Sequence, residues 1–196
     1  MMKRKRFIQL LGILCFVGGI TAVFLIITFE QTGWDKPGSL VYQTYEMLNR
    51  HMAGTLLLMA AGWLGMVFWL SQGYGRWAAT GAFISSLLMV VGVAAEFWLY
   101  TDLPYAQTNM HSTAFLLFGL SSFALDLSVM VLGISLWRSR LWSRWSALVL
   151  LFALPLDLAS FFWLDSIFLA AAILALVTGA HLTLTKRLPA QIGTAV

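Results

Sequence analysis

Two aspartates lie inside strongly apolar segments of this sequence, Asp126 in FGLSSFALDLSVMVLG and Asp157 in LVLLFALPLDLASFFW. A basic turn separates them, because Asp126 comes twelve residues before Arg138 and Asp157 thirteen residues after Arg144. At a rise of about 1.5 Å per helical residue, both carboxyl groups are expected about 18 to 20 Å into a membrane. Two carboxyl groups that meet in a medium of low dielectric constant cannot both ionise, so they share a proton. The pair predicts a proton or cation site; the alternative is two protonated aspartates that join helices by hydrogen bonds.

Two serines and a proline accompany these aspartates. Ser122 lies four residues before Asp126 and Ser160 three residues after Asp157, so each serine shares a helix face with its aspartate and is a candidate hydrogen-bond partner. Pro155 has no backbone N–H to donate within a helix. We therefore expect the helix to kink about one turn before Asp157.

Carboxylate and imidazole groups also gather in the segments expected on the outer side of the membrane. Zinc accepts both kinds of ligand, but no two of these groups have metalloprotease spacing such as HExxH. They are candidate ligands of a metal or of a small molecule, with solvated loop residues as the alternative. The groups are Glu46, His51, Glu96, Asp102, His111 and Asp165.

The third histidine, His181, lies five residues before Lys186, at the opposite side of the expected membrane from His51 and His111. Ligation of a haem between helices would need two histidines at comparable depth, so this kind of haem site is not expected. We expect His181 to form a hydrogen bond near the membrane interface. The cofactor, if any, is not predicted by the sequence.

The composition predicts that the membrane is the solvent of these segments. Hydrophobic residues make up 60% of the 196 residues and charged residues 10%, whereas soluble domains average about 25% charged. The net charge of +4 comes from short basic clusters between apolar runs, which is typical of membrane topology and not of a nucleic-acid-binding face. A single cysteine, Cys15, excludes an internal disulfide.

The apolar runs predict one all-α domain over residues 1–196, with six transmembrane helices. Residues 30–51 form the longest polar interval, expected to be an outer loop with a short interfacial helix or an extension of the second helix. With the N-terminus inside, ten lysines and arginines fall on the inner side and two on the outer side, so both termini are expected in the cytoplasm. The six helices are expected at about residues 7–29, 52–70, 77–100, 114–136, 146–163 and 167–185.

Small residues and one deep tryptophan indicate where helices or ligands approach. Ala171, Ala175 and Gly179 lie on one face of the sixth helix, which suits either internal packing or the docking of a partner subunit. Trp63 is deep enough in the second helix to line a ligand cavity.

No hydrolase, phosphate-binding or metalloprotease motif occurs in the sequence. We therefore interpret the chain as a small multi-pass protein of the inner membrane that binds a small molecule or ion in an outer-facing polar cavity, or that serves as an accessory subunit of a membrane complex. The ligand site would include Asp126, Asp157 and Glu96. The alternative is an intramembrane enzyme, hydrolase-like and metal-dependent, that uses the outer histidines and carboxylates. Nucleic acid is excluded as a partner.

Overall fold

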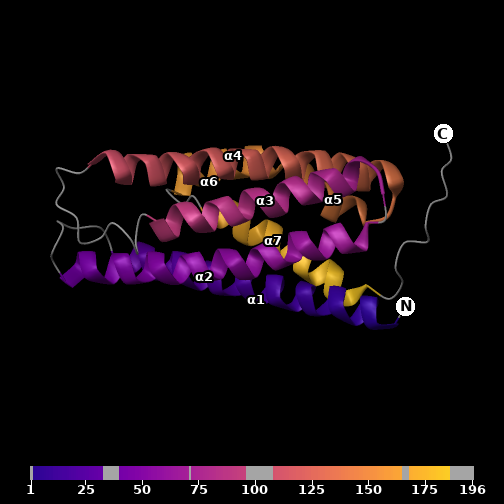
Figure 1. The fold of residues 1–196 in the computed structure, drawn as a ribbon, viewed down its shortest axis with the longest axis horizontal. Coiled ribbons are helices and arrows are strands. Elements are labelled where there is room, and N and C mark those ends of the chain that lie inside the picture. The colour runs from indigo at the N-terminus through magenta and orange to yellow at the C-terminus, as the bar shows by residue number, and fades with distance from the viewer. Residues whose placement is uncertain (1, 33–39, 71, 96–107, 165–167, 186–196) are drawn as a thin grey trace.

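The computed structural model describes residues 2–32, 40–70, 72–95, 108–164 and 168–185, and all regular structure in these residues is helical. The helices run roughly antiparallel along one long axis (Figure 1). Their bounds are α1 (Met2–Thr32), α2 (Leu40–Trp69), α3 (Tyr74–Ala94), α4 (Thr108–Ser139), α5 (Arg144–Leu151), α6 (Ala153–Leu164) and α7 (Leu169–Leu184).

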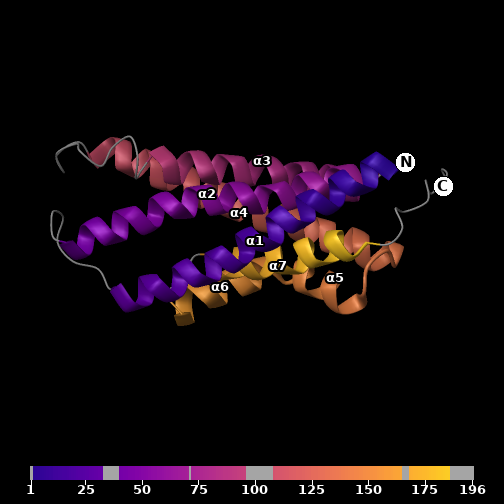
Figure 2. The same ribbon diagram turned by 90° about the horizontal axis from the view of Figure 1, so that it is seen from below.

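Neighbouring helices in the chain pack side by side, and α7 closes the bundle. α1 packs against α2 and α7, α3 lies between α2 and α4, and α5 and α6 cover α4 on its other side. The views in Figures 1 and 2 agree that α1 begins and α7 ends at the same end of the bundle. Every described lysine and arginine except Arg50 lies at this basic end, because these residues begin α1, α3 and α5 or end α4.

The surface of the bundle is apolar, as expected for helices that face lipid. Phe24 in α1 is 71% exposed, Leu120 in α4 is 61% exposed and Phe162 in α6 is 73% exposed. Soluble proteins rarely leave apolar patches of this extent in water. The all-helical fold is thus confirmed, and its surface suits a multi-pass membrane protein.

Four of the described helices are long and apolar enough to cross a membrane, and the pair α5 and α6 makes a fifth if it counts as one broken span. The sixth expected crossing is shorter than predicted. α7 has 16 residues, or about 24 Å at 1.5 Å per residue, whereas a bilayer core is about 30 Å thick.

Helix bounds differ from the expectation where the apolar pattern gave no clear limit. Residues 40–51 continue α2 without interruption, so the extension of the second helix is found and not a separate interfacial helix. α4 begins at Thr108 and ends at Ser139, several residues beyond the expected limits on both sides. α3 is described from Tyr74 to Ala94, and the expected limit near residue 100 lies outside the described residues.

The expected kink before Asp157 is confirmed as a break of 58° between α5 and α6. The backbone of Phe152 donates to Leu148 O at 3.0 Å, and the next hydrogen bond across the break is from Leu156 N to Phe152 O at 2.9 Å. Pro155 lies in the first turn of α6, where its missing N–H is tolerated. The proline therefore ends one helix and starts another.

α7 packs closely on α1 through small residues. The thiol of Cys15 donates to Ala175 O at 3.3 Å. A Cβ atom added to Gly179 would lie 2.5 Å from Phe16 N and 2.8 Å from Gly12 O, both of them backbone atoms. Ala171 is also buried. The small-residue face of α7 is thus used for packing within the chain, the first of the two alternatives.

This close approach predicts that Gly179→Ala destabilises the fold. The new methyl group would overlap backbone that cannot move aside, and overpacking of this kind costs about 1 to 3 kcal/mol. Gly54→Ala is the matched control, because nothing lies within 4 Å of a Cβ there and alanine favours a helix by about 0.5 to 1 kcal/mol over glycine. Thermal unfolding in detergent micelles should rank Gly54→Ala at or above the unsubstituted protein and Gly179→Ala below it; equal melting temperatures for the two variants would contradict the α1–α7 contact.

Candidate functional site

The structure brings the two membrane-embedded aspartates together. The carboxyl group of Asp126 in α4 lies next to that of Asp157 in α6. Asp126 is 3% exposed, and Asp157 is half-buried. A carboxylate can only accept, so a hydrogen bond between two carboxyl groups requires that one of them is protonated. The arrangement can therefore hold a proton that both groups share.

A close contact between α4 and α5 sets the register of this pair. A Cβ atom added to Gly133 would lie 2.6 Å from Leu151 N and 3.0 Å from the carbonyl carbon of Leu150, so only glycine lets the two helices approach this far. Gly133 lies seven residues after Asp126, and Leu150 lies seven residues before Asp157. The two aspartates are thus equally far along the chain from this contact, with the break between α5 and α6 in between on one side.

The turn between α4 and α5 is held by local interactions. Ser143 caps α5, because its Oγ accepts from Ser146 N at 3.1 Å. The guanidinium of Arg144 lies over the ring of Trp137, 5.9 Å from its centroid, which is a cation–π contact. Arg140 has a φ of 52°, so it adopts the left-handed conformation that reverses the chain. The hairpin that carries both aspartates is thus fixed at its basic end.

The serines near the pair are not its hydrogen-bond partners in the described structure. The hydroxyl of Ser160 is buried and donates to Leu156 O of its own helix at 2.8 Å. Ser122 is half-buried one turn before Asp126, and no hydrogen bond between the two is found among the described residues. Asp126 Oδ2 is buried without a partner among these residues. Among the described residues neither serine is seen to donate to an aspartate, and the group next to each aspartate is the other aspartate.

Most of the other candidate residues do not join this site. Trp63 is buried in the apolar core of the bundle. His51 is exposed, and its Nδ1 lies 2.7 Å from Met47 O of its own helix. Glu46 is half-buried on α2. Glu96 and His111 lie outside the residues whose side chains the structure describes, and among those that it does describe no three His, Cys, Asp or Glu side chains are placed to hold a metal ion.

An aromatic cluster at the basic end was not predicted from the sequence. The ring of His181 lies 4.1 Å from that of Trp142 and 5.5 Å from that of Trp69, between centroids. Trp69 and Trp142 are 4% and 5% exposed, and neither indole N–H has a hydrogen-bond partner among the described residues. The cluster ties α7 to the end of α2 and to the α4–α5 turn. The sequence could have indicated this cluster through the expected topology, because the topology places all three residues at the basic end of the bundle.

Arg4 makes a further contact between helices at the basic end of the bundle. Its Nε donates to Phe68 O at 3.2 Å, and its Nη2 donates to the same oxygen. A cation at the last carbonyls of a helix also interacts favourably with the helix dipole. The first turn of α1 is thus anchored on the end of α2, beside Trp69.

The aromatic cluster predicts unequal effects for two neighbouring tryptophans. Trp142→Ala should lower stability by about 3 to 5 kcal/mol, because a large buried ring leaves a cavity. Trp145→Ala is the control, since Trp145 is 81% exposed and suits the aromatic belt at a membrane interface. Thermal unfolding in detergent would measure both, and similar melting temperatures for the two variants would show that Trp142 does not hold the cluster together.

Comparisons of this chain with protein-family models, with curated proteins and with solved structures gave no match.

Proposed function

We propose that this chain is an integral membrane protein that binds and releases a proton at the Asp126–Asp157 pair, and that this titration is coupled to the binding or movement of a small molecule or ion. The observation that carries the proposal is the juxtaposition of two carboxyl groups from α4 and α6, one of them almost fully buried. An ionisable group inside a membrane calls for a functional hypothesis, because it is costly to insert.

The free-energy cost of charge in a membrane favours an aspartate pair that keeps one proton and exchanges the other. An ionised side chain at the bilayer centre costs about 2.5 to 3.5 kcal/mol on insertion scales. A second charge about 4 Å away would add about 4 kcal/mol of repulsion at an effective dielectric constant of about 20. The doubly ionised pair is therefore strongly disfavoured without a bound cation, whereas the singly protonated pair is accessible.

The broken helix next to the pair favours a transport-type or ligand-binding site over simple helix–helix attachment. Asp157 lies five residues after Phe152, where the break occurs. Discontinuous helices in membranes are tolerated where they face protein or a polar cavity, and in transporters they supply groups that bind substrates and ions. Two helices joined only by a hydrogen bond would not need this break.

Several finer features belong to the same proposal. The arrangement of basic residues favours six crossings with both termini in the cytoplasm of a bacterial-type inner membrane, with α5 and α6 as one broken crossing and α7 as a short one. Hydrophobic mismatch of a short helix is accommodated by local thinning of the bilayer. An accessory role in a membrane complex would use surfaces other than the small-residue face of α7. The alternative of a metal-dependent intramembrane hydrolase has no described contact in its favour.

Infrared spectroscopy of the purified protein tests the shared proton. Protonated carboxylic acids have a C=O stretch distinct from that of carboxylates, and ordinary aspartates and glutamates are ionised at pH 7 because their pKa values are about 4. We expect a protonated-acid band at pH 7 that is lost in the Asp126→Asn/Asp157→Asn double variant, whose amides can still form a hydrogen bond. Glu46→Gln is the control and should retain the band. Absence of the band from the unsubstituted protein, or its persistence in the double variant, refutes the proposal.

Cysteine labelling tests the proposed topology. Cys15 is buried and is the only cysteine, so Cys15→Ala provides an unreactive background. In intact bacteria a membrane-impermeant maleimide should label the exposed position of Gln43→Cys near the start of α2. It should label the exposed position of Ser139→Cys at the end of α4 only after the membrane is permeabilised. The reverse pattern would invert the topology.

A further inference from the structure

The basic turn between α4 and α5, residues 137–145, has the sequence WRSRLWSRW. It contains Arg138, Arg140 and Arg144, and all three are exposed. The nearest acidic residues along the chain lie twelve residues before Arg138 and thirteen residues after Arg144. In the part of the chain that the structure describes, no ion pair joins these arginines to an acidic side chain. The turn therefore presents three positive charges without a counter-charge among the described residues.

The backbone of the basic turn is held in place by contacts with the bundle and within the turn. The ring of Trp142 is 5% exposed and lies 4.1 Å from that of His181 in α7, between centroids. Ser143 Oγ accepts from Ser146 N at 3.1 Å, and the hydroxyl oxygens of these two serines are 2.8 Å apart. A ligand that binds the arginines would therefore not have to order the backbone that carries them, which lowers the cost of binding.

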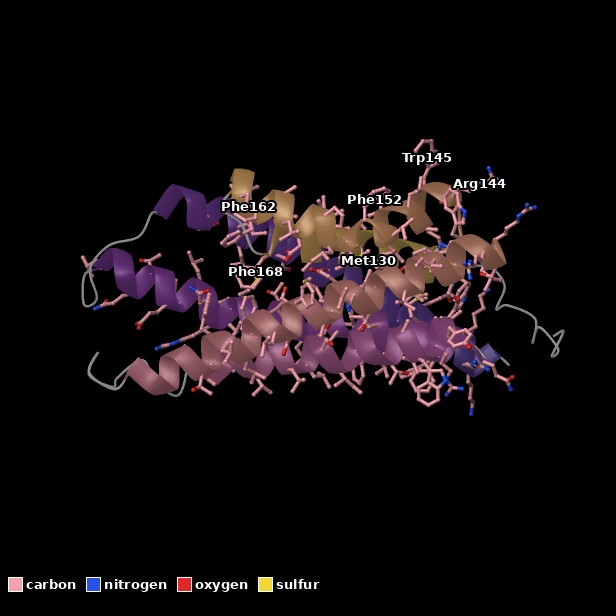
Figure 3. All side chains as sticks on the ribbon, turned by 90° about the horizontal axis from the view of Figure 1, so that it is seen from above. Met130, Arg144, Trp145, Phe152, Phe162 and Phe168 are labelled. Atoms are coloured by element: carbon pink, nitrogen blue, oxygen red, sulfur yellow. The ribbon has the colours of Figure 1, made fainter. Side chains whose placement is uncertain are left out.

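The other two tryptophans of the turn lie on its outside, together with the arginines. Trp137 is 40% exposed and Trp145 is 81% exposed. The guanidinium of Arg144 lies over the ring of Trp137, 5.9 Å from its centroid, and Figure 3 shows Arg144 and Trp145 side by side where α5 begins. Exposed indole rings are typical of the level of the lipid headgroups. The positive charges of the turn thus lie at the level of the phosphate groups of the bilayer.

We infer that the basic turn binds the headgroup of an anionic phospholipid in the leaflet at the basic end of the bundle. The guanidinium groups of Arg138, Arg140 and Arg144 donate hydrogen bonds to the phosphate oxygens. Arginine suits this role because its planar guanidinium can donate two parallel hydrogen bonds to one phosphate group. Anionic lipids of the cytoplasmic leaflet attract basic segments next to transmembrane helices. This inference does not depend on the aspartate pair.

A lipid fits the turn better than a soluble anion does. A soluble phosphate would meet the charges alone and would leave the apolar surface beside them uncovered. Ile134 lies one turn before Trp137 on α4 and is 40% exposed, so an acyl chain can cover it while the phosphate group of the same lipid meets the arginines. The N-terminal end of α5 adds a partial positive charge at the same place.

Native mass spectrometry of the purified, delipidated full-length protein in detergent tests the site. The probes are phosphatidylglycerol and phosphatidylcholine with the same acyl chains, so that they differ in headgroup charge. We expect phosphatidylglycerol to bind at about tenfold lower concentration, a difference of about 1.4 kcal/mol. The triple variant Arg138→Gln/Arg140→Gln/Arg144→Gln should lose this preference. Equal binding of the two lipids by the unsubstituted protein would overturn the inference.

The basic residues at the start of α1 provide a control with the same change of charge. Lys3→Gln/Lys5→Gln/Arg6→Gln also removes three positive charges from the basic end, but α1 contains no tryptophan. This variant should keep its preference for phosphatidylglycerol. An equal loss of preference in both triple variants would show that the lipid responds to net charge alone, and the site at the turn would be refuted.

Arg144→Lys separates the geometry of the guanidinium from its charge. Lysine keeps the positive charge but cannot donate two parallel hydrogen bonds to a phosphate group, so binding of phosphatidylglycerol should weaken by about threefold. Arg6→Lys is the control and should bind as the unsubstituted protein does. An unchanged affinity of Arg144→Lys would contradict the role given to Arg144.

Thermal unfolding in detergent gives a second measurement, in which each variant is compared with its own lipid-free sample. Phosphatidylglycerol should raise the melting temperature of the unsubstituted protein and of the α1 variant, but not that of the turn variant. Sodium phosphate should have no more effect than sodium chloride of the same ionic strength. If sodium phosphate raises the melting temperature as much as the lipid does, or if a poly-glutamate peptide displaces the lipid, the turn binds a soluble anion and the lipid assignment is overturned.

Discussion

The contact of Gly133 with the backbone at Leu150 and Leu151 is the constraint on which the aspartate pair depends. Helices packed through larger side chains are about 8 to 10 Å apart, and a glycine lets them come closer. This contact lies seven residues from each aspartate along its segment and holds α5 against α4, and the 58° break that follows sets the direction of α6. The carboxyl groups meet because the backbones are pressed together two turns away, and not because the two acids attract each other.

The second constraint is that backbone polar groups in a membrane must find partners within the protein. A break of 58° is therefore costly, and the chain places it where α4 and the two carboxyl groups are next to it. No backbone hydrogen bond from Ala153 or Leu154 is found across the break among the described residues. The break lies five residues before Asp157, so it is close to the aspartate pair along the chain.

The sequence was sufficient to predict the helical membrane fold, the equal depth of the two aspartates and the kink before Asp157, because each follows from counting residues along helices. Whether the carboxyl groups meet depends on helix rotation, which the sequence pattern does not determine when both faces of a segment are apolar. The contact at Gly133 brings the two segments together, but a single glycine in the sequence of a membrane helix does not by itself predict such a contact. The length of α7 and the burial of His181 between two tryptophans were missed for a similar reason, since they are set by packing against other helices.

The interpretation of the pair as simple helix attachment accounts for less of the geometry than a binding site does. Attachment needs only one hydrogen bond between the helices. An asparagine in place of either aspartate would make the same attachment without the cost of burying an acid. A group that must change its charge as it binds and releases a proton has to be an acid.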